Sequence, residues 1–317
     1  MGEFNSSKET LMRKSPALVA ILYHDTKINL DSILNILQKK KYKILIVLDG
    51  IKKIKVKNKN NIKIISLKKS GISICRNFCI NYGIKKKFKY LIFFDSDCIP
   101  HDKTVETHIK KHDMYKEYQL IGGAVRPSFL KKKTTSLITK VDGIMSWFGA
   151  VEQKIDNEVK FPYHIPTLNM SIKLEFLKKS KIKFLSHLKT GEDFKFCKDV
   201  KEKGGKILSI TGAVVDHEDR KSFSDVINHQ SKWGKHQFYT LYNYKFKNSL
   251  LFNILFIFFY LPLIPVLSIF ISFISMFPWM GKNIKYSKYF LFVFLICNIK
   301  CFHSYIECFN DLKKKLT

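Results

Sequence analysis

Arginine is scarce in this chain of 317 residues. Among 56 basic residues only Arg13, Arg76, Arg126 and Arg220 are arginine, and lysine supplies the rest of a net charge of +30. Specific readers of nucleic acid depend on the forked arginine side chain, which binds phosphate or a base edge through two hydrogen bonds. The lysine excess therefore argues against a nucleic-acid partner. It still favours anionic partners such as phosphorylated substrates and the cytoplasmic face of a membrane.

The signals of a disulfide framework, a zinc site and secretion are also missing. The seven cysteines include no C-x-x-C pair, and their odd number excludes complete pairing within the chain. Cys75 and Cys79 lie one helical turn apart, but no His or carboxylate accompanies them at zinc-ligand spacing. The polar N-terminal tail, residues 1–14, lacks the apolar run of a signal peptide. We therefore expect reduced thiols in a cytoplasmic environment.

Charge is absent from residues 249–280, a run longer than the ~20 residues that a membrane-spanning helix needs. A second apolar stretch, 289–299, is too short to span unless it continues towards Phe309. The linker between the two stretches is rich in lysine, which predicts a cytoplasmic position and favours a first segment that enters and returns. We expect residues 246–317 to form a hydrophobic, helical, membrane-associated region. The alternative is a buried helix of a soluble fold.

Continuous apolar runs of strand length occupy residues 17–23, 42–48, 62–67 and 90–94, with helical patterns between them. Strands that are apolar on both faces and alternate with helices predict a parallel sheet covered on two sides. Ligands of such sheets bind at the carboxyl ends of the strands. Tyr23, Asp49 and Asp95 stand at three of these ends, so we expect them to converge on one crevice within an α/β domain spanning residues 15–245.

The triplet Asp95-Ser96-Asp97 follows directly after the fourth of these strands. Two carboxylates one residue apart supply oxygen ligands for Mn²⁺ or Mg²⁺ and leave coordination positions open for phosphate oxygens. A divalent ion bridging a nucleoside diphosphate neutralises the charge that develops when this leaving group departs. The alternative interpretation is a turn before Pro100 that Asp and Ser cap.

Other polar residues stand at matching positions along the chain. Asp49 can accept hydrogen bonds from a nucleobase imide, and Arg76 can steady that carboxylate or a diphosphate. Asp193, at the start of a predicted helix, is a candidate general base for an acceptor hydroxyl, and its alternative role is to complement the helix dipole. His217, at the end of a predicted strand over 207–215, is a candidate third metal ligand or a structural histidine.

The order of these motifs resembles the signature string of family-2 glycosyltransferases with the GT-A fold. The matching segments span residues 17–242; in order they are Tyr23 after a strand, Leu48-Asp49-Gly50, Ser70-Gly71 through Arg76-Asn77, Asp95-Ser96-Asp97, Asn169-Met170-Ser171, Gly191-Glu192-Asp193 and Asp216-His217. The resemblance implies an α/β, Rossmann-like, mixed and mainly parallel sheet flanked by helices.

The same resemblance implies roles for individual residues. Asp49 would bind the base, commonly uracil, and Arg76 would lie in the donor site with Tyr23. Asp95 and Asp97 would hold the metal and the diphosphate, with His217 near the metal. Asp193 would be the base of an inverting transfer.

Residues on the acceptor side are suggested by the segment His229-Gln-Ser-Lys232-Trp233-Gly234, which resembles the helix that follows the active site in membrane-associated members of this family. A basic residue and a Trp often border the acceptor channel there. Processive synthases carry Gln-x-x-Arg-Trp, and the replacements His229 and Lys232 argue against processive synthesis. We place Lys232, Trp233, Glu192 and Asn169 on the acceptor side.

The function that we predict is an inverting transfer of one sugar from a UDP-type nucleotide sugar to a hydroxyl of a glycan or lipid-linked acceptor. It would serve the synthesis of a cell-surface polysaccharide or glycoconjugate on the cytoplasmic side of the inner membrane. One alternative is a sugar-nucleotide nucleotidyltransferase, which usually has a Gly-rich basic loop after its first strand; residues 24–29 contain none. The other alternative is a lysine-rich, non-enzymatic binder of nucleic acid or anionic membrane.

Overall fold

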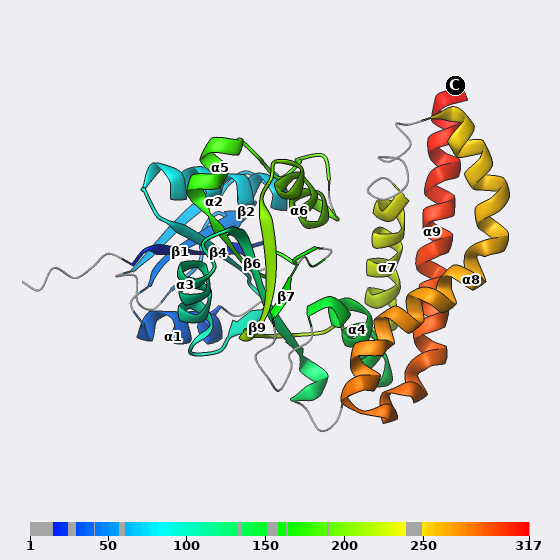
Figure 1. The fold of residues 1–317 in the computed structure, drawn as a ribbon, viewed down its shortest axis with the longest axis horizontal. Coiled ribbons are helices and arrows are strands. Elements are labelled where there is room, and N and C mark those ends of the chain that lie inside the picture. Colours follow the sequence, from blue (N-terminus) through cyan, green and yellow to red (C-terminus); the bar gives the residue numbers. More distant parts are fainter. Residues whose placement is uncertain are drawn as a thin grey trace, which may run out of the picture.

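The computed structural model describes residues 15–24, 30–40, 42–56, 61–131, 135–150, 158–160, 162, 164–188, 190–238 and 249–316. Its elements form a sheet with helices on both faces, followed by a group of C-terminal helices that lies beside it (Figure 1). The polar tail predicted over residues 1–14 lies outside the described residues.

The sheet has the strand order β3-β2-β1-β4-β8-β6-β9-β5, and β7 pairs with β9. Its parallel half contains the four strands that the sequence predicts: β1 (Ala17–Tyr23), β2 (Lys43–Asp49), β3 (Ile62–Leu67) and β4 (Tyr90–Asp95). Antiparallel pairs begin where β8 (Asn169–Lys173) lies between β4 and β6 (Tyr118–Pro127). The short strands β5 (Cys98–Pro100) and β7 (Glu158–Lys160) run antiparallel to β9 (Lys206–His217), which is parallel to β6. The sheet is therefore mixed, as the family resemblance implied.

Alternate residues of β1 enter different cores, because successive side chains of a strand point to opposite faces. Val19 and Ile21 pack in the cluster that includes α1 (Asp31–Lys39) and α4 (Leu137–Trp147). Leu18 and Ala20 pack in the cluster that includes α2 (Ile72–Lys85), α5 (Leu174–Ser180) and α6 (Glu192–Glu202). The other helix of the sheet domain, α3 (Thr104–Met114), contributes Val105 to the first cluster. All seven cysteines are free and buried.

The C-terminal group consists of α7 (Phe223–Gln237), α8 (Leu250–Lys282), a 3-10 turn over Ile284–Tyr289, and α9 (Phe290–Leu316). Whether the first apolar segment enters and returns, as the lysine-rich linker favours, or crosses a membrane stays a prediction. The segment forms one helix with Pro262, Pro265 and Pro278 inside it, and Figure 1 shows α8 bent near its middle. Proline removes one backbone donor and bends a helix without ending it when neighbouring turns hold the chain.

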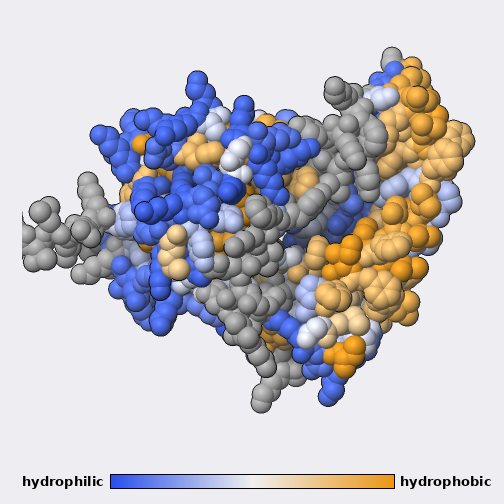
Figure 2. Space-filling model, viewed as in Figure 1, coloured by the Kyte–Doolittle hydropathy of each residue, from blue (hydrophilic) through white to orange (hydrophobic). Residues whose placement is uncertain are grey.

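The second apolar stretch does continue beyond Lys300 and His303, so that α9 is long enough to cross a bilayer. By length and composition both α8 and the segment Ile284–Leu316 are candidate membrane spans, and only 22% and 28% of their most apolar windows are buried. Such exposure disfavours the alternative of a soluble core helix. Figure 2 shows apolar residues gathered over these helices, beside a hydrophilic sheet domain.

The C-terminal helices pack directly on the sheet domain. Trp279 of α8 is fully buried and donates its indole N–H to the carbonyl of Ile144 in α4, at 3.1 Å. Phe129, in the turn after β6, stacks at a tilt against Trp279 with 5.4 Å between ring centroids. The orientation of α8 is thus fixed relative to the sheet.

Candidate functional site

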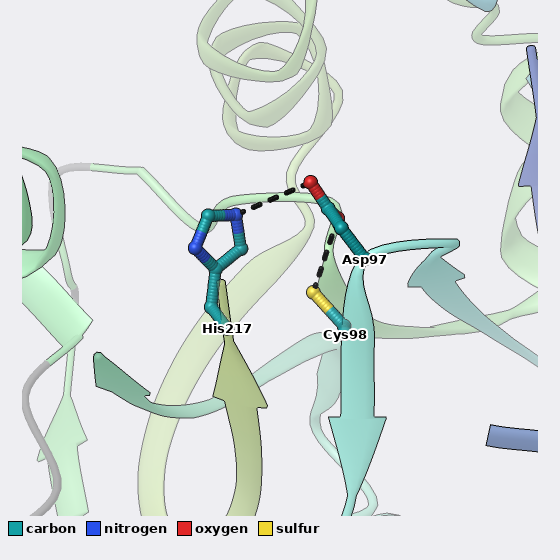
Figure 3. Close-up of side chains that lie close together, drawn as sticks. All are labelled: Asp97, Cys98 and His217. Carbon is teal, nitrogen blue, oxygen red and sulfur yellow. Dashed lines mark hydrogen bonds and ion pairs between the residues drawn. The ribbon is translucent and has the colours of Figure 1, made fainter. Parts of the chain in front are cut away.

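Three side chains gather at one edge of the sheet: Asp97 between β4 and β5, Cys98 at the start of β5, and His217 at the end of β9 (Figure 3). One potential ligand atom of each lies within 4.8 Å of the others. Asp97 Oδ2 is 3.5 Å from His217 Nε2, and the Cys98 thiol donates to Asp97 Oδ1 at 3.7 Å. The antiparallel pairing of β5 with β9, which places Cys98 opposite His217, creates this proximity.

The predicted ligand set was Asp95, Asp97 and His217. In the structure the compact group contains Cys98, whereas Asp95 turns towards Arg76, 3.6 Å away. The side chains of Asp95 and Asp97 are 33% and 39% exposed, so both carboxylates remain open to a ligand. Two reachable carboxylates and an imidazole suit Mn²⁺ or Mg²⁺, and a thiol adds affinity for softer ions. The residues present therefore fit a divalent cation.

Charge in this group is balanced among the side chains themselves. Burial raises the pKa of Asp95, with Arg76 opposing and Asp97 adding to the rise. For Asp97 the hydrogen bond and the charge of His217 outweigh burial and lower the pKa. Burial lowers the pKa of His217, but its contacts with Asp219 and Asp97 prevail and raise that pKa to about 9. When no metal ion is bound, the charge of His217 thus lies between the carboxylates of Asp97 and Asp219.

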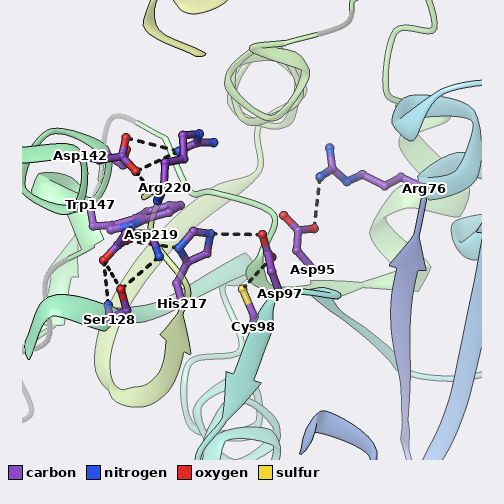
Figure 4. A network of polar contacts seen from close by, with 11 residues as sticks. Arg76, Asp95, Asp97, Cys98, Ser128, Asp142, Trp147, His217, Asp219 and Arg220 are labelled. Carbon is purple, nitrogen blue, oxygen red and sulfur yellow. Dashed lines mark hydrogen bonds and ion pairs between the residues drawn. The ribbon is translucent and has the colours of Figure 1, made fainter. Parts of the chain in front are cut away.

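Asp219 lies behind His217 and was not found by sequence reasoning (Figure 4). Its side chain is fully buried, and its Oδ1 lies 3.4 Å from His217 Nδ1. The same oxygen accepts the indole N–H of Trp147 at 3.1 Å, and its Oδ2 accepts the backbone N–H of Ser128 at 2.8 Å and the hydroxyl at 3.0 Å. A carboxylate on Nδ1 fixes the ring so that Nε2 faces the Asp97 side. The available sequence signal was a second acidic residue two positions after the histidine.

Replacement of Asp219 by Asn tests this arrangement. The amide keeps the size of the side chain but removes the charge that orients His217, and we expect Mn²⁺ affinity to fall by about 10- to 100-fold. Electron paramagnetic resonance of free Mn²⁺ measures this binding without any turnover, and circular dichroism checks that the fold persists. Unchanged Mn²⁺ affinity in a folded variant would remove the positioning role of Asp219.

Arg76 of α2 connects the carboxylates of the site. Its guanidinium is buried, forms an ion pair with Glu192 at the start of α6, and reaches Asp95 on its other side. Arg76 also lies over the ring of Phe184, with 5.4 Å to the centroid. Its Nε has no partner among the described atoms. The sequence predicted Arg76 in the donor site but gave no sign of its pairing with Glu192.

Asp193 follows Glu192 in the first turn of α6. Its carboxylate accepts the backbone N–H of Phe194 at 2.7 Å. Burial, and next the charge of Glu192, raise the pKa of Asp193 to about 7, against the opposing charge of Arg76. A carboxylate with this pKa can both take and return a proton near neutral pH, which is the property of a general base.

Asp49 lies at the end of β2 and caps the start of α2. Its carboxylate accepts the backbone N–H groups of Ser70 at 2.6 Å and of Gly71 at 3.1 Å. Tyr23, at the end of β1, is only 5% exposed. The donor-binding roles of Asp49 and Tyr23 stay predictions.

The residues predicted on the acceptor side separate into two groups. Asn169 is buried, and its amide bonds the carbonyls of Ala124 and Ala213, both at 2.9 Å, and the ring of His108, so its acceptor role stays a prediction without support from an exposed side chain. Glu192 is committed to Arg76, and its acceptor role stays a prediction. Lys232 is exposed on α7, and Trp233 is half-buried between His229 and Lys300 of α9.

The chain has a mixed α/β sheet with flanking helices, and this fold is similar to that of solved glycosyltransferase structures. The solved structure of S. aureus TarS 1-349 in complex with UDP-GlcNAc aligns with a TM-score of 0.50 and 16% identity, over 69% of this chain and 64% of that chain. The alignment thus spans less than two-thirds of that TarS fragment. The same fragment with UDP aligns over 95% of this chain and 92% of that chain, at 14% identity and a TM-score of 0.49. At such identities the likeness shows the fold. No protein-family model and no curated protein sequence matches the chain.

Proposed function

We propose that this protein is a metal-dependent glycosyltransferase that moves one sugar from a UDP-type nucleotide sugar to a hydroxyl of a glycan or lipid-linked acceptor, with inversion. The observation that carries the proposal is the meeting of two kinds of group at one sheet edge. Asp97, Cys98 and His217 form a candidate cation-binding cluster, and Asp95 lies beside it. Arg76 links Asp95 to Glu192, which precedes the candidate base Asp193.

The donor side rests on the charge of these groups. Asp97 and His217, with Asp95 or Cys98, would hold Mn²⁺ or Mg²⁺, which supplies Lewis-acid neutralisation of the diphosphate when bound. Arg76 keeps Asp95 in place and presents a second positive charge to the same phosphates. Asp49 would recognise the base from the end of β2, where its carboxylate also holds α2 in register.

The transfer itself requires a single proton acceptor. Asp193 takes the proton of the acceptor hydroxyl as the oxygen forms its bond to the anomeric carbon. The bond between that carbon and the diphosphate oxygen breaks on the opposite face, and the electron pair leaves with the diphosphate. Attack and departure on opposite faces invert the anomeric centre.

The exposed apolar surface of α8 and α9 supports a position at the membrane. The lysines of the connecting segment, Lys282, Lys285 and Lys288, would face the anionic cytoplasmic leaflet. In this position the protein would act on the cytoplasmic side of the inner membrane, in the synthesis of a cell-surface polysaccharide or glycoconjugate.

A screen of nucleotide sugars tests the proposal. Purified protein with Mn²⁺ is incubated with UDP-, GDP- and TDP-sugars, and release of the nucleoside diphosphate is measured with and without chelator. We expect chelator-sensitive hydrolysis of one UDP-sugar. Absence of hydrolysis and of thermal stabilisation by all donors would contradict the proposal.

A further inference from the structure

Lys300 is the only charged residue between Lys288 and Glu307, in the apolar part of α9. It does not point away from the protein. Its side chain is half-buried, and its ammonium lies 5.1 Å from the centroid of the Trp233 ring on α7. Within the part of the chain that the structure describes, no carboxylate forms an ion pair with Lys300 or with Lys232. An ionisable residue kept in an apolar segment without a counter-ion is a marker of a functional site.

The position of Lys300 is fixed by unusually close contact between α7 and α9. A Cβ on Gly234 would stand 2.1 Å from the Lys300 carbonyl oxygen, so only glycine permits this approach. Ser304, one turn further along α9, donates its hydroxyl to the carbonyl of Gly234 at 2.6 Å. The ammonium is therefore held beside Trp233 by the backbone of both helices.

Positive charge accumulates around this point. His229 lies one turn before Trp233 on α7, with 5.3 Å between their rings. Burial, and then the charges of Arg220 and Lys300, lower the pKa of His229 to about 3, with Lys232 contributing in the same direction. Arg220 is itself anchored by Asp142 at 3.2 Å. His229 is thus neutral, and among the described residues near it Arg220 is paired with a carboxylate, whereas Lys232 and Lys300 form no ion pair.

The same lysine acts on a histidine beside the helix of the candidate base. Burial, and then the charge of Lys300, lower the pKa of His164 to about 4. The His164 ring is 6.1 Å from that of Phe194, the residue directly after Asp193. His164 thus connects the surroundings of Lys300 with the first turn of α6.

We propose that Lys300, with Arg220 and Lys232, binds a phosphate group carried by the acceptor. This inference rests on the proposed function, since it names the acceptor class of the same site. A phosphate ester supplies the missing counter-ion, and several cations around one point suit its charge and its multiple acceptor oxygens. Trp233 offers an aromatic face beside it for the attached sugar or chain. The phosphate belongs either to a lipid-linked saccharide, whose apolar chain would follow α9, or to a soluble phosphorylated glycan.

Binding of dodecyl phosphate in dodecyl maltoside micelles tests the site, at saturating UDP and Mn²⁺ so that the donor site is filled. Dodecanol is the neutral comparison, and glucose 6-phosphate is the soluble arm. We expect wild type to bind dodecyl phosphate over dodecanol and K300M to lose roughly tenfold in affinity. K300R should retain most of the affinity. K235M removes an exposed lysine of α7 to which no binding role is assigned and should behave as wild type, which controls for general attraction to an anionic micelle.

Equal binding of dodecyl phosphate by wild type and K300M would overturn the phosphate site. Equal losses of affinity in K300M and K235M would overturn it as well. Lys300-dependent binding of glucose 6-phosphate as tight as that of dodecyl phosphate supports the site with a soluble acceptor, and preference for dodecyl phosphate supports a lipid-linked one. Hydrolysis of the UDP-sugar without acceptor is measured in parallel. If wild type does not hydrolyse the UDP-sugar, the proposed function is contradicted. If wild type and K300M hydrolyse it equally, the donor site is intact in both, and the binding result then tests the phosphate site alone.

Discussion

Replacement of Asp193 by Asn should lower the rate of sugar transfer by about 10²- to 10⁴-fold, the usual contribution of a positioned general base. Affinity for UDP and Mn²⁺ should stay within a few-fold of wild type, because Asp193 contacts neither in the proposed mechanism. Single-turnover transfer and calorimetric UDP binding separate the two effects. Asp199→Asn is the matched control, since Asp199 lies on the same helix and pairs with Lys195. Transfer at more than half the wild-type rate would exclude Asp193 as the base.

The pH dependence of the same reaction follows from the raised pKa of Asp193, about 7. Only the ionised carboxylate accepts a proton, so kcat/KM for the acceptor should rise tenfold per pH unit below about 7 and level off above it. In Asp193→Asn this slope should disappear. A profile that falls with rising pH between 6 and 8 would contradict the assignment.

Replacement of Asp97 by Ala should reduce metal-dependent transfer by roughly 10³-fold, because a lost Lewis-acid contribution of several kcal/mol corresponds to a factor of this size. The fold should persist, since the Asp97 side chain is 39% exposed and contacts the side chains of His217 and Cys98. Thermal unfolding checks this point. Asp113→Ala serves as control, because it removes a half-exposed carboxylate paired with Lys89 far from the cluster.

The outcome for Asp97→Ala that would count against the metal role is equally specific. Full activity of the variant in chelator-treated buffer would show that transfer does not need this carboxylate. If Asp97→Ala loses both its activity and its folded state, Asp97→Asn is measured in its place, because the amide keeps the size of the side chain and can still form hydrogen bonds. Activity of Asp97→Asn equal to wild type would contradict the metal role as well.

The parallel half of the sheet could be predicted because its strands are buried on both faces and are therefore continuous apolar runs. β1 has seven buried residues in succession, and Asp49 and Asp95 follow β2 and β4 at the edge where ligands bind. The region between β4 and α6 could not be resolved into elements. Its strands carry polar residues such as Asn169 and Ser171 that bond buried histidines of α3, and these bonds depend on pairing across the sheet.

The candidate site could likewise be predicted from the sequence only in part. Asp97 and Asp193 could be proposed because each stands beside a strand end or at a helix start, and Arg76 because of the motif resemblance; their roles stay predictions. Cys98 and Asp219 were missed because their importance comes from the pairing of β5 with β9 and from burial against Trp147, which no local pattern encodes. The single bent helix α8 could not be singled out from the sequence, because prolines in an apolar segment are compatible with both a bend and a turn.

The measurement that tests the central account most directly is the affinity of Mn²⁺ with and without UDP, followed by electron paramagnetic resonance. A cation shared between Asp97, His217 and a diphosphate must bind more tightly when UDP is present, and by reciprocity UDP must bind more tightly when Mn²⁺ is present. We expect at least a tenfold mutual enhancement, which Asp97→Ala removes. The same Mn²⁺ affinity in the presence and absence of UDP would contradict the account.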